Sequence, residues 1–171
     1  YESHSKIIEE GYKLFTDLFG YDSKSFIAPN YTWHPMHEDV LSKLGVKYLQ
    51  GTSAQHVPLQ GNKQKNKYHY TGELNSNNQI YMVRNCIFEP SSNPNKNWVT
   101  SCFKEINRAF ENKRPAIICS HRVNFIGSIF PGNRDENLKL LEDLLKKVLK
   151  KWPDVEFMTS DQLGELIEKG I

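Results

Sequence analysis

The chain contains little cysteine and no long apolar segment. Three cysteines, Cys86, Cys102 and Cys119, occur among 171 residues, and no two of them have Cys-x-x-Cys spacing. This odd number disfavours a disulfide framework and a cysteine-based zinc motif, so we expect buried thiols instead. No run approaches the ~18 consecutive apolar residues of a membrane helix, and we therefore expect no membrane span.

The chain also lacks an excess of charge of either sign. It has 22 basic and 20 acidic residues, which gives a formal net charge of +2. Nucleic-acid-binding domains usually carry a clustered basic excess, so this balance argues against a nucleic-acid partner. The short lysine-rich stretch at 63–67 lies among Asn and Gln residues and is typical of a solvated loop.

Several catalytic motifs are missing as well. The sequence contains no Gly-x-Ser-x-Gly nucleophile elbow, no glycine-rich phosphate loop and no His-Glu-x-x-His. These absences disfavour a serine hydrolase, a nucleotide-binding enzyme and a zinc peptidase. Any active site is expected to use acid–base or metal-assisted chemistry.

Apolar periodicity predicts alternating helices and strands within one α/β domain over residues 1–171. The predicted helices cover 5–19, 36–44, 97–110, 138–152 and 160–167, and the predicted strands cover 25–28, 46–49, 80–83, 117–119 and 155–158. Such alternation is typical of a parallel sheet, because parallel neighbours need crossover connections. A long polar excursion at 50–79, with a hairpin inside it, interrupts the pattern.

Polar residues follow the predicted strands. They are Asn30 and Tyr31 after the first strand, Arg84 and Asn85 after the third, and His121 and Arg122 after the fourth. The C-terminal ends of parallel strands meet at one edge of a sheet, so we expect these residues to form a site for a polyol or a carboxylate. The alternative is that strand ends are polar simply because the chain leaves the core there.

His121 is the strongest catalytic candidate among the six histidines. It ends the run Pro115–Arg122, in which a buried strand gives way abruptly to Ser-His-Arg. Imidazole is the usual general acid near neutral pH. The His34 and His37 pair has a spacing that zinc could use, but two solvent-facing imidazoles at a loop-to-helix junction explain it better. We assign no metal ligand.

Three segments resemble the C-terminal part of a polysaccharide deacetylase domain, in a divergent bacterial branch of that family. Phe26-Ile27-Ala28-Pro29, followed by Leu44-Gly45-Val46, resembles the strand that carries the family's arginine. Residues 115–121 resemble the late strand that ends in its general-acid histidine. The close of the chain, with Trp-Pro-Asp-Val and Glu-Phe-Met-Thr-Ser, resembles the family's usual ending.

This resemblance implies a hydrolase that removes acetyl groups from a polysaccharide, built on a distorted (β/α) barrel. It implies His121 as the general acid and a divalent metal, zinc by preference, held by an Asp and two His. It also suggests that Tyr31 and Trp33 stack on sugar rings and that Arg84 or Arg122 holds a carboxylate or the substrate. Trp98, at helical spacing, is predicted to be a core residue instead.

The sequence departs from the family pattern in two places. The Asp-Asp and His-x-x-x-His motifs do not occur, so we expect the metal and base residues upstream of this chain, and Ile27 stands where the family has arginine. We expect the 171 residues alone to be inactive and to bind no catalytic metal tightly. A homo-oligomer or an upstream segment is expected to cover the exposed strand edges.

Two alternatives stay open. The chain is also compatible with a non-catalytic, carbohydrate-binding relic of the deacetylase fold, or with a different barrel enzyme that uses a histidine acid.

Overall fold

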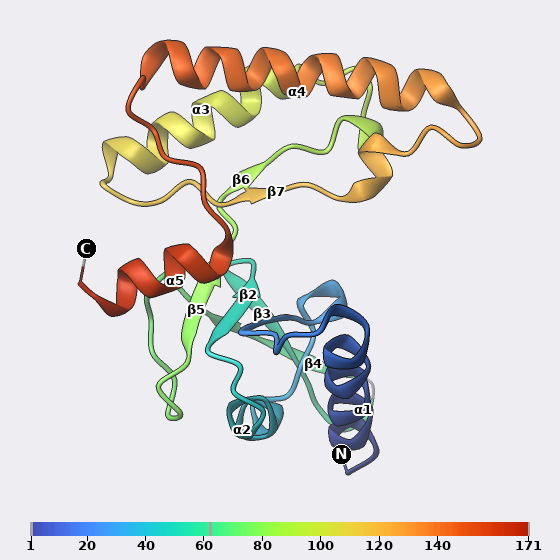
Figure 1. The fold of residues 1–171 in the computed structure, drawn as a ribbon, viewed down its shortest axis with the longest axis vertical. Coiled ribbons are helices and arrows are strands. Elements are labelled where there is room, and N and C mark those ends of the chain that lie inside the picture. Colours follow the sequence, from blue (N-terminus) through green and yellow to red (C-terminus); the bar gives the residue numbers. More distant parts are fainter. Residues whose placement is uncertain (1, 62, 171) are drawn as a thin grey trace. The chain divides into compact units, whose positions relative to one another are not determined.

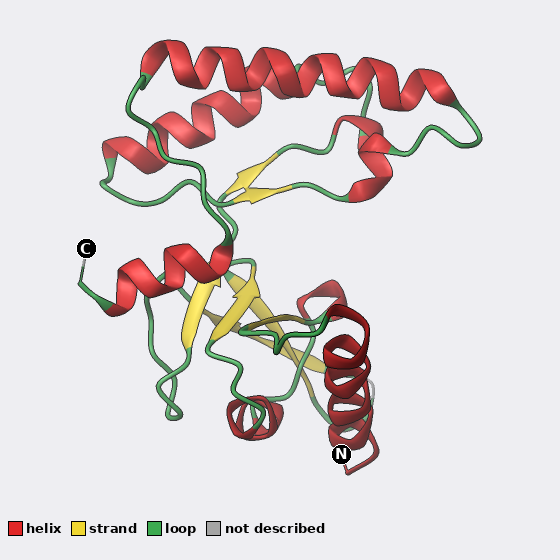
Figure 2. Cartoon of the chain, in the orientation of Figure 1, coloured by secondary structure: helices red, strands yellow, loops and turns green. Residues whose placement is uncertain are grey.

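A computed structural model describes residues 2–61 and 63–170 and divides the chain into two compact units. Unit 1 comprises Tyr1–Val83 with Met158–Ile171, and unit 2 comprises Arg84–Phe157. Figure 1 labels the elements, and Figure 2 separates helices, strands and loops by colour. The fold is mixed α/β with small parallel sheets, and the described strands form no closed barrel.

Unit 1 is built on a three-stranded parallel sheet. Its strands are β1 (Ser25–Ile27), β2 (Tyr48–Gly51) and β5 (Ile80–Val83), in the order β1-β2-β5. Helices α1 (Glu2–Phe19) and α2 (Met36–Lys43) contact each other, and α5 (Ser160–Glu168) contacts β2 and β5. Every residue of β5 is buried, as expected for a parallel strand that is covered on both faces.

Neighbouring residues of β2 point into different layers of the unit. Leu49 joins the core that contains Trp33, Leu41 and Tyr81. Tyr48 points to the opposite face, where a Cβ added to Gly164 in α5 would lie 2.2 Å from its ring. A glycine at position 164 therefore lets α5 approach the sheet closely.

An antiparallel hairpin lies in the predicted excursion. It joins β3 (Ala54–Pro58) to β4 (Gln64–Tyr68), in which Ala54 pairs with Tyr68. The predicted hairpin is thus confirmed. A turn follows at 75–78, where the Asn78 N–H donates to the Asn75 carbonyl at 3.1 Å.

Unit 2 is a strand–helix–strand unit with a second helix. The parallel strands β6 (Cys86–Ile87) and β7 (Ile118–Cys119) are joined through α3 (Trp98–Glu111), and α4 (Pro131–Lys151) packs along α3 (Figure 1). Three short 3-10 helices complete the described elements: η1 (Pro29–Tyr31) in unit 1, and η2 (Pro90–Ser92) and η3 (Arg122–Phe125) in unit 2. Trp98 is 7% exposed and belongs to the core of unit 2, as predicted.

The predicted helices are confirmed, but the helix predicted at 138–152 begins seven residues earlier, at Pro131. Asn97 caps α3 by accepting from the Thr100 N–H at 2.9 Å. Thr159 caps the last helix and forms a capping box with Gln162. Every described helix is too short or too polar to cross a bilayer.

The prediction of one five-stranded sheet is wrong. Only Arg84 and Asn85 separate β5 from β6, which is far too short for a crossover between parallel neighbours, and the two strands belong to different sheets. The strand predicted at 155–158 is also wrong. This segment forms no ladder, and the Val155 N–H donates to the Trp152 carbonyl just behind it.

Candidate functional site

The two parallel strands of unit 2 bring a carboxylate and an imidazole to the same edge. In the β6–β7 register, Cys86 pairs with Ile118 and Ile87 pairs with Cys119. The Phe88 N–H extends the pairing by donating to the Cys119 carbonyl at 2.9 Å. Two residues beyond the last pair, Glu89 and His121 lie opposite each other at the C-terminal ends of the strands.

Glu89 and His121 form a short hydrogen bond. The Glu89 Oε1 lies 2.6 Å from the His121 Nδ1, and the side chains are 15% and 60% exposed, respectively. An ionised carboxylate only accepts hydrogen bonds, so the proton of this contact belongs to Nδ1. The Nε2 atom, on the far side of an exposed ring, remains available to another molecule.

Asn124 fixes the second oxygen of the carboxylate. Its Nδ2 donates to the Glu89 Oε2 at 2.7 Å and to the His121 carbonyl at 2.8 Å, while its Oδ1 accepts from the Ser91 N–H at 3.0 Å. Asn124 is fully buried. Glu89 is therefore held on one oxygen by the imidazole and on the other by a rigid amide.

Further amides support Asn124 from α4. Asn137 donates to the Asn124 carbonyl at 2.8 Å and to the Ser91 hydroxyl at 2.9 Å. Asn133 accepts from the same hydroxyl at 2.7 Å. This amide network ties η2, η3 and α4 together beneath the Glu89–His121 pair. Removing one member of such a buried network would cost about 1–3 kcal/mol.

Cys119 and Arg84 border the pair. The Cys119 Sγ lies 4.0 Å from the Glu89 Oε1, and the Arg84 Nη1 lies 3.7 Å from the same sulfur. Cys119 is buried, whereas Arg84 is partly exposed. One face of unit 2 thus combines a carboxylate, an imidazole, a thiol and a guanidinium.

Glu89, Cys119 and His121 are also the one group of three potential metal ligands found among residues 2–61 and 63–170, with ligand atoms within 4.8 Å of one another. Donors bound tetrahedrally at about 2.1 Å from a metal are separated by roughly 3.4 Å. The 2.6 Å contact between Glu89 and His121 is too short for that and is the distance of a charge-assisted hydrogen bond. This group also differs from the Asp and two His that the resemblance implies, so the residues present do not fit the metal site of that family.

The other two thiols belong to the core. Cys86 and Cys102 are completely buried in the core of unit 2. Burial raises the pKa of each thiol to about 12, with a smaller contribution from Glu105, so both remain protonated near neutral pH. They confirm the prediction of buried thiols and are poor candidates for nucleophiles.

Arg84, Asn85 and Arg122 lie in unit 2 with His121, but their positions differ from those that the strand pattern indicated. Arg84 lies beside the site through its contact with Cys119, whereas Arg122 is exposed in η3. Asn85 lies at the opposite end of the two-stranded sheet, where its amide accepts from the Ile117 N–H at 2.8 Å and donates to the Pro115 carbonyl at 2.9 Å. Both of its polar groups hold the backbone of the strand that leads to His121.

Asn30, Tyr31 and Trp33 belong to unit 1. Asn30 and Tyr31 adopt left-handed backbone conformations in η1, with φ of 50° and 55°. The Trp33 ring is 7% exposed and donates from Nε1 to the Glu38 Oε1 at 3.0 Å. An indole buried in this way serves the core of unit 1, so we leave Trp33 out of the site.

The histidines of the predicted loop-to-helix junction are not two solvent-facing imidazoles. His37 is 4% exposed, and burial lowers its pKa, with further lowering by the nearby His4 and His34. The His34 Nδ1 accepts from the Met36 N–H at 3.2 Å. Within the described residues, neither histidine belongs to a three-ligand group.

Two residues of the site were missed in the sequence. Glu89 follows the apolar run Cys86-Ile87-Phe88, and this short strand was not predicted because two residues of ladder leave almost no periodicity. Asn124 lies three residues after His121, the spacing at which a 3-10 turn brings a side chain back to the preceding backbone. The sequence did offer one signal of this site: Glu89 directly follows one apolar run, and His121 closely follows another.

Comparison of the chain with protein-family models, with curated proteins and with solved structures found no match.

Proposed function

We propose that unit 2 carries the proton-donating half of a hydrolase site that removes acetyl groups from a polysaccharide. The observation that carries this proposal is the 2.6 Å contact between Glu89 Oε1 and His121 Nδ1. It holds the ring in one orientation, favours a proton on Nδ1 and leaves Nε2 to exchange a proton with a substrate. The substrate class comes from the resemblance of residues 115–121 and of the chain's close to polysaccharide deacetylases.

His121 acts when the acyl bond breaks. A water oxygen adds to the acetyl carbon and gives a proton to the base supplied from outside this sequence. The bond from that carbon to the sugar oxygen or nitrogen then breaks, acetate is released, and the departing atom takes the proton from Nε2. Glu89 stabilises the imidazolium before the transfer and keeps the ring aimed during it, and Asn124 keeps Glu89 in place. In the family that the chain resembles, a divalent metal polarises the carbonyl and activates the water.

The metal and base residues of that family are absent from this sequence. We therefore propose that they are supplied from outside it, as the resemblance to the C-terminal part of a distorted barrel implies. The two parallel strand–helix–strand segments, β1-α2-β2 and β6-α3-β7, support this proposal, because α/β barrels also use this type of segment.

The test compares leaving groups in the full-length protein, with and without added zinc. Acetate release from acetylated chitooligosaccharide or xylan should fall about 10²–10⁴-fold in His121→Ala, the usual contribution of a general acid. Hydrolysis of 4-nitrophenyl acetate should fall far less, because nitrophenolate leaves without a proton. His56→Ala, an exchange in the hairpin of unit 1, is the matched control.

Two results would overturn the proposal. The first is an equal loss on both substrates in His121→Ala, which would show that the residue does not protonate the leaving group. The second is oligosaccharide binding without acetate release under any metal, which would favour the non-catalytic relic.

A second candidate is a zinc site, favoured by the convergence of Glu89, Cys119 and His121. Three such ligands and an open fourth position are typical of catalytic zinc. Binding would require the Glu89–His121 hydrogen bond to open. Equilibrium dialysis of the 171-residue chain decides: stoichiometric zinc that is lost in Cys119→Ser supports the zinc site, and no retained zinc supports the proton-transfer pair.

A further inference from the structure

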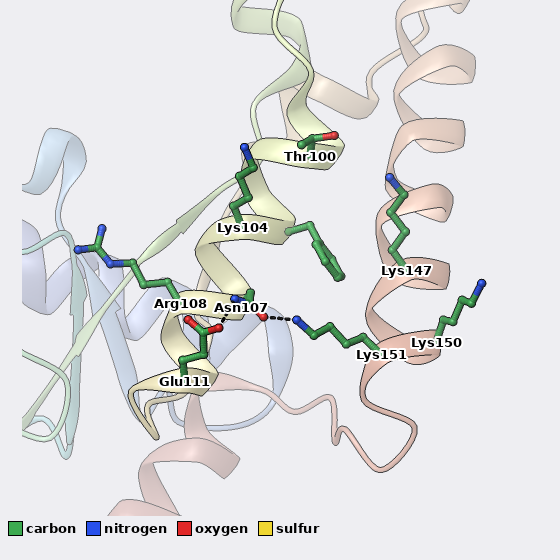
Figure 3. A pocket seen from close by; sticks show the side chains of 9 residues that line it. Thr100, Lys104, Asn107, Arg108, Glu111, Lys147, Lys150 and Lys151 are labelled. Carbon is green, nitrogen blue, oxygen red and sulfur yellow. Dashed lines mark hydrogen bonds between the residues drawn. The ribbon is translucent and has the colours of Figure 1, made fainter.

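A basic groove runs between the two helices of unit 2. It has a volume of about 950 Å³ and lies between one face of α3 and the C-terminal part of α4. Figure 3 shows Lys104, Arg108 and Glu111 on α3 and Lys147, Lys150 and Lys151 on α4; Lys147 and Lys151 point towards α3, whereas Arg108 and Lys150 point outward. Five cations and one anion thus line a single surface of a chain whose net charge is only +2.

No ion pair described for residues 2–61 and 63–170 includes any of these five cations; the pairs on α4 join Lys146 to Glu142 and Arg134 to Asp135. Glu111, the one acid of the groove, accepts instead from the Asn107 Nδ2 at 2.7 Å. All five cationic side chains belong to exposed residues. An uncompensated cluster of this kind attracts anions.

Part of the groove is ordered before any ligand binds. Lys151 donates to the Asn107 Oδ1, and its Nζ lies 4.8 Å from the centre of the Trp152 ring and 5.7 Å from that of Phe103 (Figure 3). Holding the ammonium group in this way reduces the entropy that binding would otherwise cost. Thr100 and Asn107 add polar groups that can bond to hydroxyls.

We infer that the groove binds a short stretch of an acidic glycan that carries carboxylates on successive sugars. This inference rests on the proposed function for the choice of a polysaccharide as the partner. The volume is that of a small-molecule site and suits a few sugar residues. The cations are spread along both walls, which suits carboxylates at intervals better than one compact phosphate.

The lining argues against a single-stranded nucleic acid. Such ligands bind by stacking successive bases on exposed aromatic rings. Phe103 is the one aromatic among the nine lining residues and is only partly exposed. The hydroxyl and amide groups of Thr100 and Asn107 offer a sugar more than they offer a base.

The experiment measures binding of galacturonate oligomers to the 171-residue chain by calorimetry. Binding should weaken at least ten-fold between about 50 and 300 mM salt, because salt screens exposed charges. Neutral galactose oligomers of the same length should not bind detectably. His121→Ala should bind the galacturonate oligomers normally, so a failure of the proposed catalysis and a failure of this groove are distinguishable.

Charge reversal locates the site. The triple variant Lys147→Glu, Lys150→Glu and Lys151→Glu should weaken binding by at least ten-fold. Its control reverses Lys13, Lys43 and Lys139, three exposed lysines outside the groove, and has the same net charge. A double variant on the α3 wall, Lys104→Gln with Arg108→Gln, should weaken binding about three- to ten-fold. It replaces the triple variant in the test if the triple variant unfolds.

Three outcomes would overturn the inference. They are an equal loss in the groove and control variants, equal binding of the neutral oligomers, or tighter groove-dependent binding of single-stranded DNA of the same charge. The last would assign the surface to nucleic acid.

Discussion

Residues 2–61 and 63–170 contain two histidine–carboxylate pairs, one in each unit, and the two pairs have opposite surroundings. In unit 1, His69 contacts Glu73 through Nδ1 at 3.0 Å and Gln55 through Nε2 at 2.8 Å, and its ring stacks on Tyr81 at 3.6 Å. Its side chain is 1% exposed, against 60% for His121 in unit 2. Both ring nitrogens of His69 are hydrogen-bonded to protein side chains, whereas the Glu89 contact of His121 involves only Nδ1 and leaves Nε2 on the exposed side of the ring.

The difference distinguishes a buried, fully hydrogen-bonded histidine from an exposed one. The His69 pair belongs to a buried network in which Glu38 accepts from Tyr81 at 2.9 Å and from Trp33 at 3.0 Å. Such a saturated network makes a core specific and has no group to spare for a substrate. A carboxylate beside a histidine therefore indicates a functional site only when the second ring nitrogen has no hydrogen-bond partner within the protein.

The largest expected contrast is in stability. His69→Ala should lower the free energy of unfolding by about 2–4 kcal/mol, since it leaves a cavity and deprives Gln55 and Glu73 of a partner. His121→Ala should change it by less than about 0.5 kcal/mol, because the ring is exposed. Urea unfolding of both variants measures this contrast. Equal losses would mean that His121 is as structural as His69.

A smaller effect is expected at Asn124. Asn124→Ala should lower acetate release from a sugar ester about ten-fold, less than the loss of the acid itself, because Glu89 loses the amide that orients it. Hydrolysis of 4-nitrophenyl acetate should change little. An equal loss on both substrates, or full activity on the sugar ester, would show that Asn124 does not act through the pair.

The smallest effect concerns acid stability in unit 1. Burial lowers the pKa of His37, so the folded state binds this proton less readily than the unfolded state does. The stability that the neutral ring contributes is present above about pH 6.5 and is lost as the pH falls towards the lowered pKa. His37→Gln should reduce the loss of unfolding free energy that accompanies a fall from pH 7 to pH 5, and urea unfolding at the two pH values measures it. An unchanged pH dependence would contradict this assignment.

Much of the architecture could be predicted from the sequence because the longer elements bury a continuous apolar stripe. The helices and the strands β1, β2 and β5 follow from such patterns. The division into two sheets could not be predicted, because β6 has only two residues and directly follows β5. The segment at 155–158 has the composition of a strand but finds no partner.

The site was predictable only in part. His121 was found because an apolar run in the sequence ends abruptly in polar residues, although Ile118 of that run is exposed in the structure. Glu89 was missed, since a contact between residues 32 apart depends on the register of two very short strands. Trp33 was predicted to meet a sugar, but its position in the core depends on the partner Glu38, which no local pattern reveals.

The most direct test of the central claim is nitrogen NMR of the imidazole rings in the 171-residue chain. The account predicts that neutral His121 carries its proton on Nδ1, held by Glu89, and that Nε2 carries none. In Glu89→Ala the proton should move to Nε2, the tautomer that an unconstrained imidazole prefers. A neutral His121 protonated on Nε2 in the unaltered chain would contradict the account.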